Sequence, residues 1–348
     1  FDGDGWPDVV LSGTDAPILL RNRGDGTFED ATEPSGIGAA WRAAGTASGR
    51  SNGVAFFDCD NDADADLYVT TLAGKQHYLF VNTDGRGAFE EQAALRGVAV
   101  LGDAGSAPAV RTAGTGIAVG DYDGDGWLDL YVAEWRPYTV GAGGSSGSRL
   151  MRNLGGAGRA CFFEDATEAA GLALEALTPP LLLRGMRAYP YPEPGRPDES
   201  EHASHNLQQS DGALVDTITN GIFTFSPAFV DLDGDGWLDL AIAGDFHTSM
   251  LFFNQRDGRF SEEVSAASGV GKEENGMGSA FADVDCDGHL DWFVSSVYDT
   301  RPRDYSTPFG VSGNRLYRWG SATPASTSST SADRSSSGQF DDWTDDAG

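Results

Sequence analysis

A short acidic motif, D-x-D-x-D-G-x-x-D, occurs five times in this 348-residue sequence and could bind metal ions. Alternate side chains of a tightly turning loop point inward, so carboxylates at positions 1, 3 and 5 can surround one cation. Glycine at position 6 accepts the positive φ of the turn, position 7 offers its backbone carbonyl, and position 9 adds another carboxylate. Such hard oxygen ligands favour calcium over softer metals.

The five copies are loop 1 (Phe1–Asp8, without its first Asp), loop 2 (Asp58–Asp66), loop 3 (Asp121–Asp129), loop 4 (Asp231–Asp239) and loop 5 (Asp283–Asp291). The predicted Ca²⁺ ligands are, loop by loop, Asp2, Asp4, Trp6 and Asp8; Asp58, Asp60, Asp62, Asp64 and Asp66; Asp121, Asp123, Asp125, Trp127 and Asp129; Asp231, Asp233, Asp235, Trp237 and Asp239; and Asp283, Asp285, Asp287, His289 and Asp291.

An EF-hand shares the start of this motif but needs a bidentate glutamate at position 12 and a helix on each side. Position 12 is Val69, Val132, Ile242 or Val294 in loops 2 to 5. Short β-type segments follow each loop instead, such as Leu130-Tyr131-Val132. The motif therefore predicts calcium loops attached to strands, and five copies in one context strengthen that interpretation.

A second signature follows each loop: Asn22 to Phe28 (N-x-G-D-G-x-F) recurs at Asn82 to Phe89, Asn153 to Phe162 and Asn254 to Phe260, and in degraded form at Gly338 to Phe340. Asn-Gly and Asp-Gly pairs between apolar segments are typical of tight hairpins, because these residues tolerate positive φ. One unit is therefore strand, calcium loop, strand, connection, strand, hairpin and strand, which describes a four-stranded blade.

Successive complete loops start 63, 110 and 52 residues apart. Four-stranded units with periods near these values indicate an all-β fold, the β-propeller. The long interval contains one unit plus an insertion, since 173–220 carries neither signature. We expect one propeller over 1–348, with blade units at about 1–52, 53–113, 114–221, 222–276 and 277–348, and insertions at 173–220 and 321–338.

The stretch from Gly116 to Val132, with its N-x-G-D-G-x-F and F-x-D-A-T-x-x-A-G-L partners, resembles FG-GAP/VCBS repeats. More narrowly it is similar to the ASPIC/UnbV group of cartilage-acidic-protein-like proteins, and integrin α-chain propellers share the calcium loop. The resemblance implies a seven-bladed, calcium-stabilised, extracellular propeller. It is specific for fold and metal, and unspecific for partner or reaction.

The sequence departs from that pattern at both ends and in loop 2. It opens inside a calcium loop and stops after a fourth-strand motif, and Ala63 replaces glycine at position 6 of loop 2. Ala63 should strain that loop by about 1 kcal/mol. We therefore expect the first two sites to be the weakest, and the five visible blades to be a fragment of a seven-bladed ring rather than a complete five-bladed one.

With 53 acidic and 23 basic residues the net charge is −30, which argues against nucleic acid or anionic membranes as partners. No apolar stretch is long enough for a membrane span, and because the sequence starts inside a loop motif, the lack of a signal peptide pattern at Phe1 carries no information. Cys59 and Cys286 fall inside calcium loops and Cys161 precedes a strand. Free, buried thiols are favoured for them over a disulfide or redox role.

Other motifs have simpler interpretations. Arg23-Gly24-Asp25, an adhesion tripeptide, lies in the hairpin that needs its Gly and Asp for the turn. The G-x-S-x-G match at 143–147 lies in a Gly/Ser-rich loop without a following helix, and His202 and His205 lie in a polar insertion. None of these motifs therefore predicts a catalytic site.

In an up-and-down blade the calcium loops and hairpins share one face, and the longer connections share the other. That second face carries aromatic residues, among them Trp41, Trp135, Tyr189 and Tyr191, and long loops on a rigid scaffold commonly bind partners. We predict a non-enzymatic, secreted or cell-surface propeller in cell adhesion or matrix binding, with a protein or glycan ligand on the face opposite the calcium. Alternatives are a carbohydrate-binding propeller and a propeller domain of a hydrolase or lyase.

Overall fold

The structure of the protein is a computed structural model. It describes residues 1–13, 15–45, 49–99, 112–135, 147–156, 158–173, 223–245, 248–261, 264–273, 275–297, 313–320 and 339–344. The G-x-S-x-G match up to Ser146, the insertion with His202, His205, Tyr189 and Tyr191, and the segment 321–338 lie outside these residues.

The described chain forms five antiparallel sheets in sequence order, here called blades 1 to 5. Their strands are β1 (Val9–Leu11), β2 (Ile18–Asn22) and β3 (Phe28–Asp30); β4 (Arg50–Phe57), β5 (Asp66–Leu72), β6 (Tyr78–Asn82) and β7 (Phe89–Glu91); β8 (Gly114–Gly120), β9 (Asp129–Glu134), β10 (Arg149–Asn153) and β11 (Phe163–Asp165); β12 (Phe223–Val230), β13 (Asp239–Asp245) and β14 (Met250–Phe252); and β15 (Gly276–Ala282), β16 (Asp291–Ser296), β17 (Arg315–Gly320) and β18 (Gln339–Asp342). The predicted all-β, blade-based architecture is confirmed.

Short helices follow the last described strand of three blades: α1 (Ile37–Ala44), α2 (Ala93–Arg96) and α6 (Ser265–Ser268). The two four-residue helices end at Gly97 and Gly269, whose φ values of 86° and 85° are left-handed. Glycine adopts this conformation without a Cβ penalty and so ends the helix. None of the described helices has the length and apolar character needed to cross a membrane.

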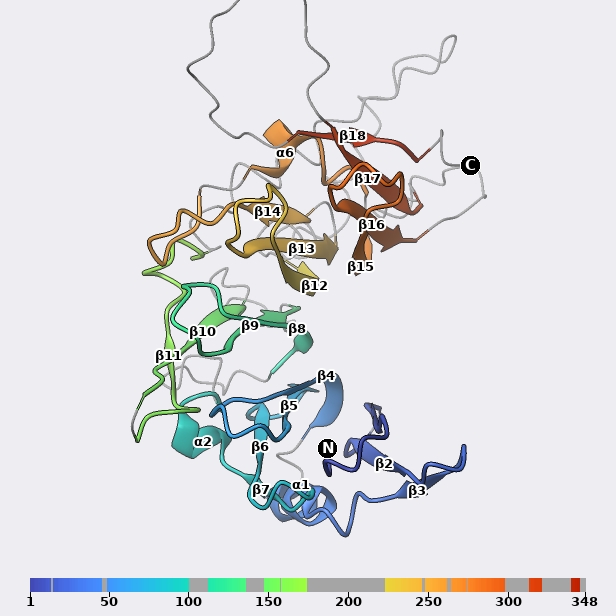
Figure 1. Ribbon diagram of the computed structural model, residues 1–348, viewed down its shortest axis with the longest axis vertical. Helices are drawn as coiled ribbons and strands as arrows, with labels where there is room; N and C mark the ends of the chain where they lie inside the picture. The colour runs from blue at the N-terminus through green and yellow to red at the C-terminus, as the bar shows by residue number, and fades with distance from the viewer. Residues whose placement is uncertain are drawn as a thin grey trace, which may run out of the picture.

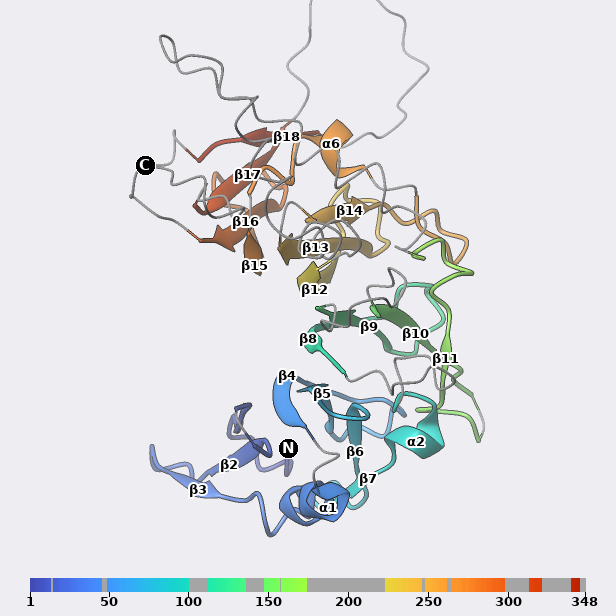
Figure 2. The same ribbon diagram turned by 180° about the vertical axis from the view of Figure 1, so that it is seen from behind.

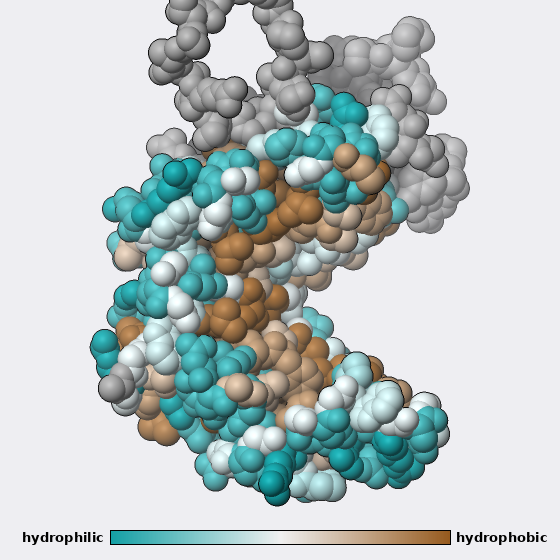
Figure 3. Space-filling view, in the orientation of Figure 1, coloured by the Kyte–Doolittle hydropathy of each residue, from teal (hydrophilic) through white to brown (hydrophobic). Residues whose placement is uncertain are grey.

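The five blades lie side by side along an open arc (Figure 1). The first strands of blades 2 to 4 line its concave side, and the outer strands, such as β11, lie on its rim. Seen from behind, blades 1 and 5 again face each other across the opening (Figure 2). Hydrophobic residues gather along the inner part of the arc and hydrophilic residues along the outer part (Figure 3).

Four hydrophobic clusters fill the four junctions between neighbouring blades. Leu19 of blade 1 packs with Leu67 of blade 2, and Tyr68 of blade 2 packs with Leu130 of blade 3. The other two clusters join blades 3 and 4 and blades 4 and 5 in the same way. Side chains along a strand alternate between its two faces. The second strand of a blade therefore contacts the preceding blade with one set of residues and the following blade with the other.

Glycines let the first strands of adjacent blades approach closely. A Cβ on Gly53 would overlap the carbonyl oxygen of Thr115, and one on Gly116 would overlap that of Phe225. Both glycines lie where the register of the first strand shifts by a bulge. A substitution at either position would therefore push two blades apart.

Candidate metal centres

In four of the five acidic loops, three carboxylates converge. One oxygen from each residue lies within 4.8 Å of the others in the trios Asp58, Asp60 and Asp62; Asp121, Asp123 and Asp129; Asp231, Asp233 and Asp239; and Asp283, Asp285 and Asp291. Positions 1 and 3 take part in every trio. Position 9 completes it in loops 3 to 5, and position 5 completes it in loop 2.

Backbone amides hold these carboxylates in place. In loop 3, Asp121 accepts hydrogen bonds from the N–H groups of Asp125 and Gly126, at 3.0 and 2.8 Å. Asp125 accepts one from the N–H of Trp127 at 3.0 Å. Loops 2, 4 and 5 repeat the pattern. The local sequence therefore folds the loop, and the ligand role predicted for the position 7 carbonyls stays a prediction.

The position 9 aspartate joins each loop to its own blade. Asp129 accepts hydrogen bonds from the N–H of Tyr122, within the loop, and from the N–H of Asn153, on the third strand. Asp66 and Asp239 are placed in the same way. Burial raises the pKa of Asp129 to about 8, and that of Asp66 and of Asp239 to about 7, with nearby loop carboxylates adding to the increase. A bound cation would favour the charged forms.

Arginines reach four of the loops from the third strand or the adjacent hairpin. Arg152 contacts Asp123 through Nε at 2.5 Å and Asp125 through Nη2 at 3.1 Å. Arg21 binds Asp2 and Asp4 of loop 1, Arg256 binds Asp235 of loop 4, and Arg318 binds Asp285 of loop 5. Arginine therefore neutralises part of the charge of these loops.

Loop 1 differs from the rest. In this loop Arg21 contacts both Asp2 and Asp4. Among the described residues its carboxylates do not form a converging trio. The structure thus places Asp2, Asp4 and Asp8 in one loop but does not gather their oxygens around one point.

Loop 2 carries five aspartates and, within the described chain, forms no ion pair. Oδ1 of Asp60 and Oδ1 of Asp64 are buried atoms without a hydrogen-bond partner. Burial and the neighbouring aspartates raise the pKa of Asp64 to about 6. Buried unpaired carboxylate oxygens are costly, and a cation would satisfy both, so these residues fit calcium.

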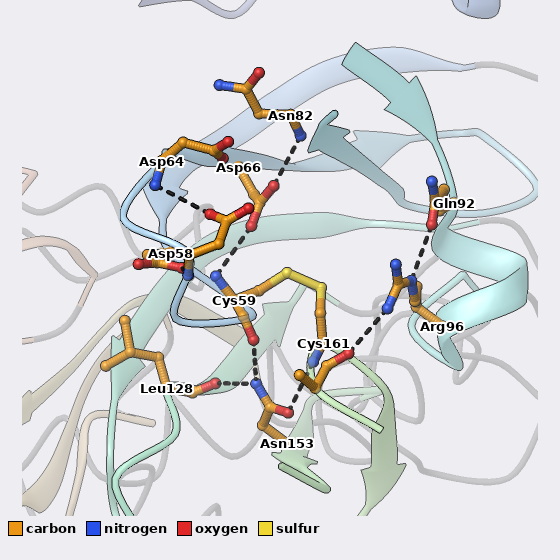
Figure 4. Close-up of a disulfide and its surroundings, with 12 residues drawn as sticks. Asp58, Cys59, Asp64, Asp66, Asn82, Gln92, Arg96, Leu128, Asn153 and Cys161 are labelled. Atoms are coloured by element: carbon orange, nitrogen blue, oxygen red, sulfur yellow. Dashed lines mark hydrogen bonds between the residues drawn. A yellow bond between two sulfur atoms is a disulfide. The ribbon is translucent and has the colours of Figure 1, made fainter. Parts of the chain in front are cut away.

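A disulfide corrects the expectation of free thiols at two positions. Cys59, at position 2 of loop 2, is bonded to Cys161 in the last hairpin of blade 3, with the two Cα atoms 4.8 Å apart (Figure 4). The residues are 102 positions apart in the sequence, so only the packing of blade 2 on blade 3 brings them together. Cys286 is free, as expected, but it is exposed rather than buried.

Sequence reasoning also missed the role of the hairpin asparagines. Asn153 Nδ2 donates to the carbonyl oxygen of Cys59 in the preceding blade at 2.8 Å (Figure 4). Asn82 and Asn254 make the same contact with the carbonyls of Phe1 and Tyr122. The asparagine therefore connects successive loops as well as forming a turn. In the sequence, the repeated Arg-Asn pair at Arg21-Asn22 and Arg152-Asn153 was the pattern that could have indicated a role for the asparagine beyond the turn.

Fold and site together define an all-β repeat protein whose blades carry acidic, metal-type loops. A family model described as FG-GAP-like repeat matches residues 1–69, 58–132 and 207–294, more than half of the chain. The chain belongs to this FG-GAP-like repeat family.

Among solved structures, the chain is similar to a lectin from Agrocybe aegerita, described by its specific recognition of non-reducing terminal N-acetylglucosamine. Sequence identity is 15% and the TM-score is 0.40, and the match covers 90% of this chain and 59% of that chain. This chain thus spans about 59% of the lectin's length. No curated protein matches the sequence.

Proposed function

We propose that this chain is a calcium-stabilised, extracellular β-propeller that binds a protein or matrix partner without catalysing a reaction. The ASPIC/UnbV group and the integrin α-type loop are the finer resemblances that support this function. The observation that carries it is the recurrence of a carboxylate trio at one place in four successive blades. A single acidic turn has little specificity, whereas four equivalent ones indicate a common ligand.

Calcium would act on structure in this proposal. It would offset the repulsion among loop carboxylates, most of all in loop 2, whose aspartates form no ion pair within the described part of the chain. In loops 3 to 5 an arginine already offsets part of this repulsion. Filled loops would stiffen the link between each loop and its second strand, leaving the opposite face as a rigid platform for recognition.

The disulfide supports an extracellular location. Stable disulfides form in oxidising compartments and are rare in the cytosol, where thiols are kept reduced. Cys59–Cys161 is buried at a blade junction and adjoins a candidate calcium loop. Millimolar calcium is also typical of extracellular fluids, where low-affinity loops of this kind fill.

Calorimetric titration of the chelated protein with CaCl₂, combined with thermal melting, tests the metal. We expect calcium binding with a rise in melting temperature, and MgCl₂ at equal concentration to have a smaller effect. The variant Asp60→Asn should lower the number of bound ions, while Asp84→Asn, in an exposed hairpin outside the loops, should not. A melting temperature that is the same with calcium and with chelator contradicts the proposal.

A second candidate, carbohydrate binding, is favoured by one cavity. About 410 Å³ of space lies between α1 and the start of β6, lined by Ala40, Ala43, Ala44, Lys75, Gln76, Tyr78 and Glu91. Tyr78 is buried, and its hydroxyl has no hydrogen-bond partner. Alanine methyls opposite one cation, one anion and an amide suit a neutral ligand with one apolar face, such as a sugar ring.

A glycan array separates the two candidates. Ala43→Trp fills the cavity, whereas Ala39→Trp, on the same helix but outside the cavity, is the matched control. Glycan binding that Ala43→Trp alone removes would favour the carbohydrate function. If the array shows no binding, this candidate is rejected while the protein-binding proposal stands.

A further inference from the structure

The hairpin asparagine connects the position 9 aspartates of successive loops. In blade 3, the backbone N–H of Asn153 donates to Oδ1 of Asp129 at 2.7 Å. Nδ2 of the same asparagine donates to the carbonyl oxygen of Cys59 at 2.8 Å, and the N–H of Cys59 donates to Oδ2 of Asp66 at 3.0 Å (Figure 4). Cys59 and Asn153 therefore link a predicted ligand of loop 2 to a predicted ligand of loop 3.

The same connection continues from loop 3 to loop 4. Oδ2 of Asp129 accepts the N–H of Tyr122 at 3.2 Å, and the carbonyl oxygen of Tyr122 accepts Nδ2 of Asn254 at 2.8 Å. The N–H of Asn254 donates to Oδ1 of Asp239 at 2.9 Å. A continuous series of hydrogen bonds thus runs from Asp66 through Asp129 to Asp239.

The series stops before loop 5. There the position of the asparagine is occupied by Trp319, whose N–H donates to Asp291 at 2.9 Å but whose side chain has no amide. The ring of Trp319 packs edge to face on Phe253, with 6.2 Å between the ring centroids. Among the described residues, no hydrogen bond connects loop 5 or its third strand to loop 4.

A second set of contacts joins the turns of loops 2, 3 and 4. Nδ2 of Asn61, at position 4 of loop 2, donates to the carbonyl oxygen of Gly126 in loop 3 at 3.1 Å. The indole of Trp237 in loop 4 lies over Gly124 of loop 3, where an added Cβ would be 3.0 Å from the ring. At Gly234, the same position of loop 4, an added Cβ would meet no atom within 4 Å. Within the described chain, both sets of contacts therefore reach loop 4 and neither extends to loop 5.

We propose that loops 2, 3 and 4 bind calcium cooperatively, whereas loop 5 binds it independently. This inference rests on the proposed calcium binding, and adds that filling one loop raises the affinity of the next. Asp129 belongs to the carboxylate trio of loop 3, so it becomes fixed when that loop is filled. Asn153 and Tyr122, which donate to Asp129, are then fixed as well, and with them the hydrogen bonds that lead to loops 2 and 4.

The expected sign of the coupling is positive. A loop whose carboxylates are already held by a filled neighbour loses less conformational freedom on binding, and this raises its affinity. Hydrogen bonds in series also strengthen one another. Loops coupled only through charge would show the opposite sign, because two bound cations repel each other. The sign of the coupling therefore distinguishes the hydrogen-bonded series from a purely electrostatic effect.

Hydrogen exchange resolved by loop tests the proposal on the unaltered chain. The chelated protein is titrated with CaCl₂, and amide protection in each of loops 2 to 5 is followed separately. We expect the curves of loops 2, 3 and 4 to be steeper than a single-site curve, and the curve of loop 5 to have the single-site shape. Single-site curves at all four loops overturn the inference and leave the proposed calcium binding intact, whereas no calcium response at any loop overturns both.

Ligand variants test the direction of the coupling. Asp123→Asn removes a carboxylate from the trio of loop 3, and it should raise the calcium midpoint of loops 2 and 4 by about tenfold while leaving loop 5 unchanged. Asp285→Asn is the matched control, since it changes the same position of loop 5 and should leave the midpoint of loop 4 unchanged. Coupling is reciprocal, so Asp60→Asn in loop 2 should shift loop 3 by the factor by which Asp123→Asn shifts loop 2. Unchanged midpoints of loops 2 and 4 in a folded Asp123→Asn protein overturn the inference.

Asn61→Gly breaks one connection without changing a ligand, and it decides the case in which Asp123→Asn does not fold. Asn61 has φ of 59°, which glycine adopts readily, so the turn of loop 2 is kept while the curves of loops 2 and 3 should become less steep. Asn52→Ala is the matched control. Nδ2 of Asn52 donates to the carbonyl oxygen of Gly114 at 2.8 Å and also joins blades 2 and 3, but near the start of their first strands, away from the loops. An equal loss of steepness in the two variants, or no loss in either, contradicts the inference.

Discussion

Loops 2 and 3 have nearly the same sequence pattern and the same backbone hydrogen bonds, but opposite electrostatic surroundings. In loop 3, Arg152 contacts Asp123 and Asp125. In loop 2 the equivalent position of the third strand is Val81, which is buried in the junction with blade 3. Loop 2 also carries a fifth aspartate, Asp64, at position 7.

The motif therefore determines the geometry of a loop. The residue on the third strand of the same blade determines how much of the loop's negative charge is neutralised. Loop 3 has an internal cation that partly replaces a metal. Among the described residues, loop 2 has only the more distant charge of Arg96 acting on Asp60 and no ion pair, and two of its buried oxygens, on Asp60 and Asp64, lack a hydrogen-bond partner. We therefore expect loop 2 to depend on calcium more than loop 3, although the sequence alone ranks it lower because of Ala63.

The largest expected effect is that of calcium removal. Each filled site contributes about 1.4 kcal/mol when calcium exceeds Kd tenfold, so four sites together contribute about 6 kcal/mol. Chelation should lower the melting temperature, and amide exchange should accelerate more in 58–66 than in 121–129. Equal acceleration in the two loops would show that Arg152 does not compensate for the metal.

The disulfide should have the next largest effect. Cys59–Cys161 links loop 2 to blade 3, and a crosslink that closes a long segment contributes about 2 to 4 kcal/mol. Cys161→Ser should destabilise the protein and increase exchange in loop 2 and in the hairpin of blade 3. At the next junction Tyr122 packs on Phe260 instead, so exchange there should change less. Cys286→Ser is the control, and we expect it to be neutral.

Much of the fold followed from the sequence because the repeat is local. Each loop, strand and hairpin of a blade lies within a short segment, so period and turn chemistry predicted the sheets. The position of the carboxylate trios followed for the same reason. What could not be predicted are the contacts between blades, since a one-dimensional repeat does not show which residues of successive units meet.

The cysteines and aromatic residues illustrate that limit. Cys59 and Cys161 belong to different repeat units, so each was interpreted as a single thiol. Trp41 was assigned to a binding surface because it falls in a connection, but it is buried and its ring lies 4.6 Å from that of Tyr78. Burial of both types of residue depends on the neighbouring blade, which the sequence of one unit does not reveal.

The position 9 aspartates of loops 2 and 3 should make the stability of the metal-free protein depend on pH. A carboxyl whose folded pKa exceeds its unfolded value stabilises the fold below the unfolded pKa and loses this contribution as pH rises through the folded pKa. The folded pKa is about 7 for Asp66 and about 8 for Asp129. In chelator, the melting temperature should therefore rise as pH falls from about 9 to about 6.

Calcium should reverse this trend, because protons then compete with the ion for the same carboxylates. Asp129→Asn in chelator should weaken the pH dependence, since it removes one of the titrating groups. Melting curves at several pH values, with and without calcium, provide the measurement. A metal-free protein that becomes more stable with rising pH over this range would contradict the prediction.

Removing the arginine should make loop 3 resemble loop 2. Arg152→Met leaves Asp123 and Asp125 without their basic partner, so the metal-free protein should lose about 1 kcal/mol. Calcium affinity at loop 3 should rise by about tenfold, because no side chain competes with the ion. Arg149→Met is the matched control, since Arg149 lies on the same strand but contacts Asp165. Equal effects of the two variants would exclude competition at the loop.

The smallest expected effect concerns the backbone of loop 2. Ala63 has φ of 72°, in the left-handed region, where the other loops have glycine. At Gly126, the same position of loop 3, a Cβ would meet no atom within 4 Å, so any cost of alanine there is conformational rather than steric. Ala63→Gly should therefore stabilise the protein by up to about 1 kcal/mol, partly offset by the greater freedom of glycine in the unfolded chain.

Calcium affinity should change little in this variant, because the ligand carboxylates of loop 2 stay in place. Ala65→Gly in the same loop is the control: Ala65 is not among the described residues with positive φ, so only the cost of a more flexible unfolded chain remains, and this variant should be slightly destabilising. Melting temperatures of both variants in calcium test the prediction. If Ala63→Gly is as destabilising as Ala65→Gly, strain at position 6 does not limit loop 2, and its charge alone distinguishes it from loop 3.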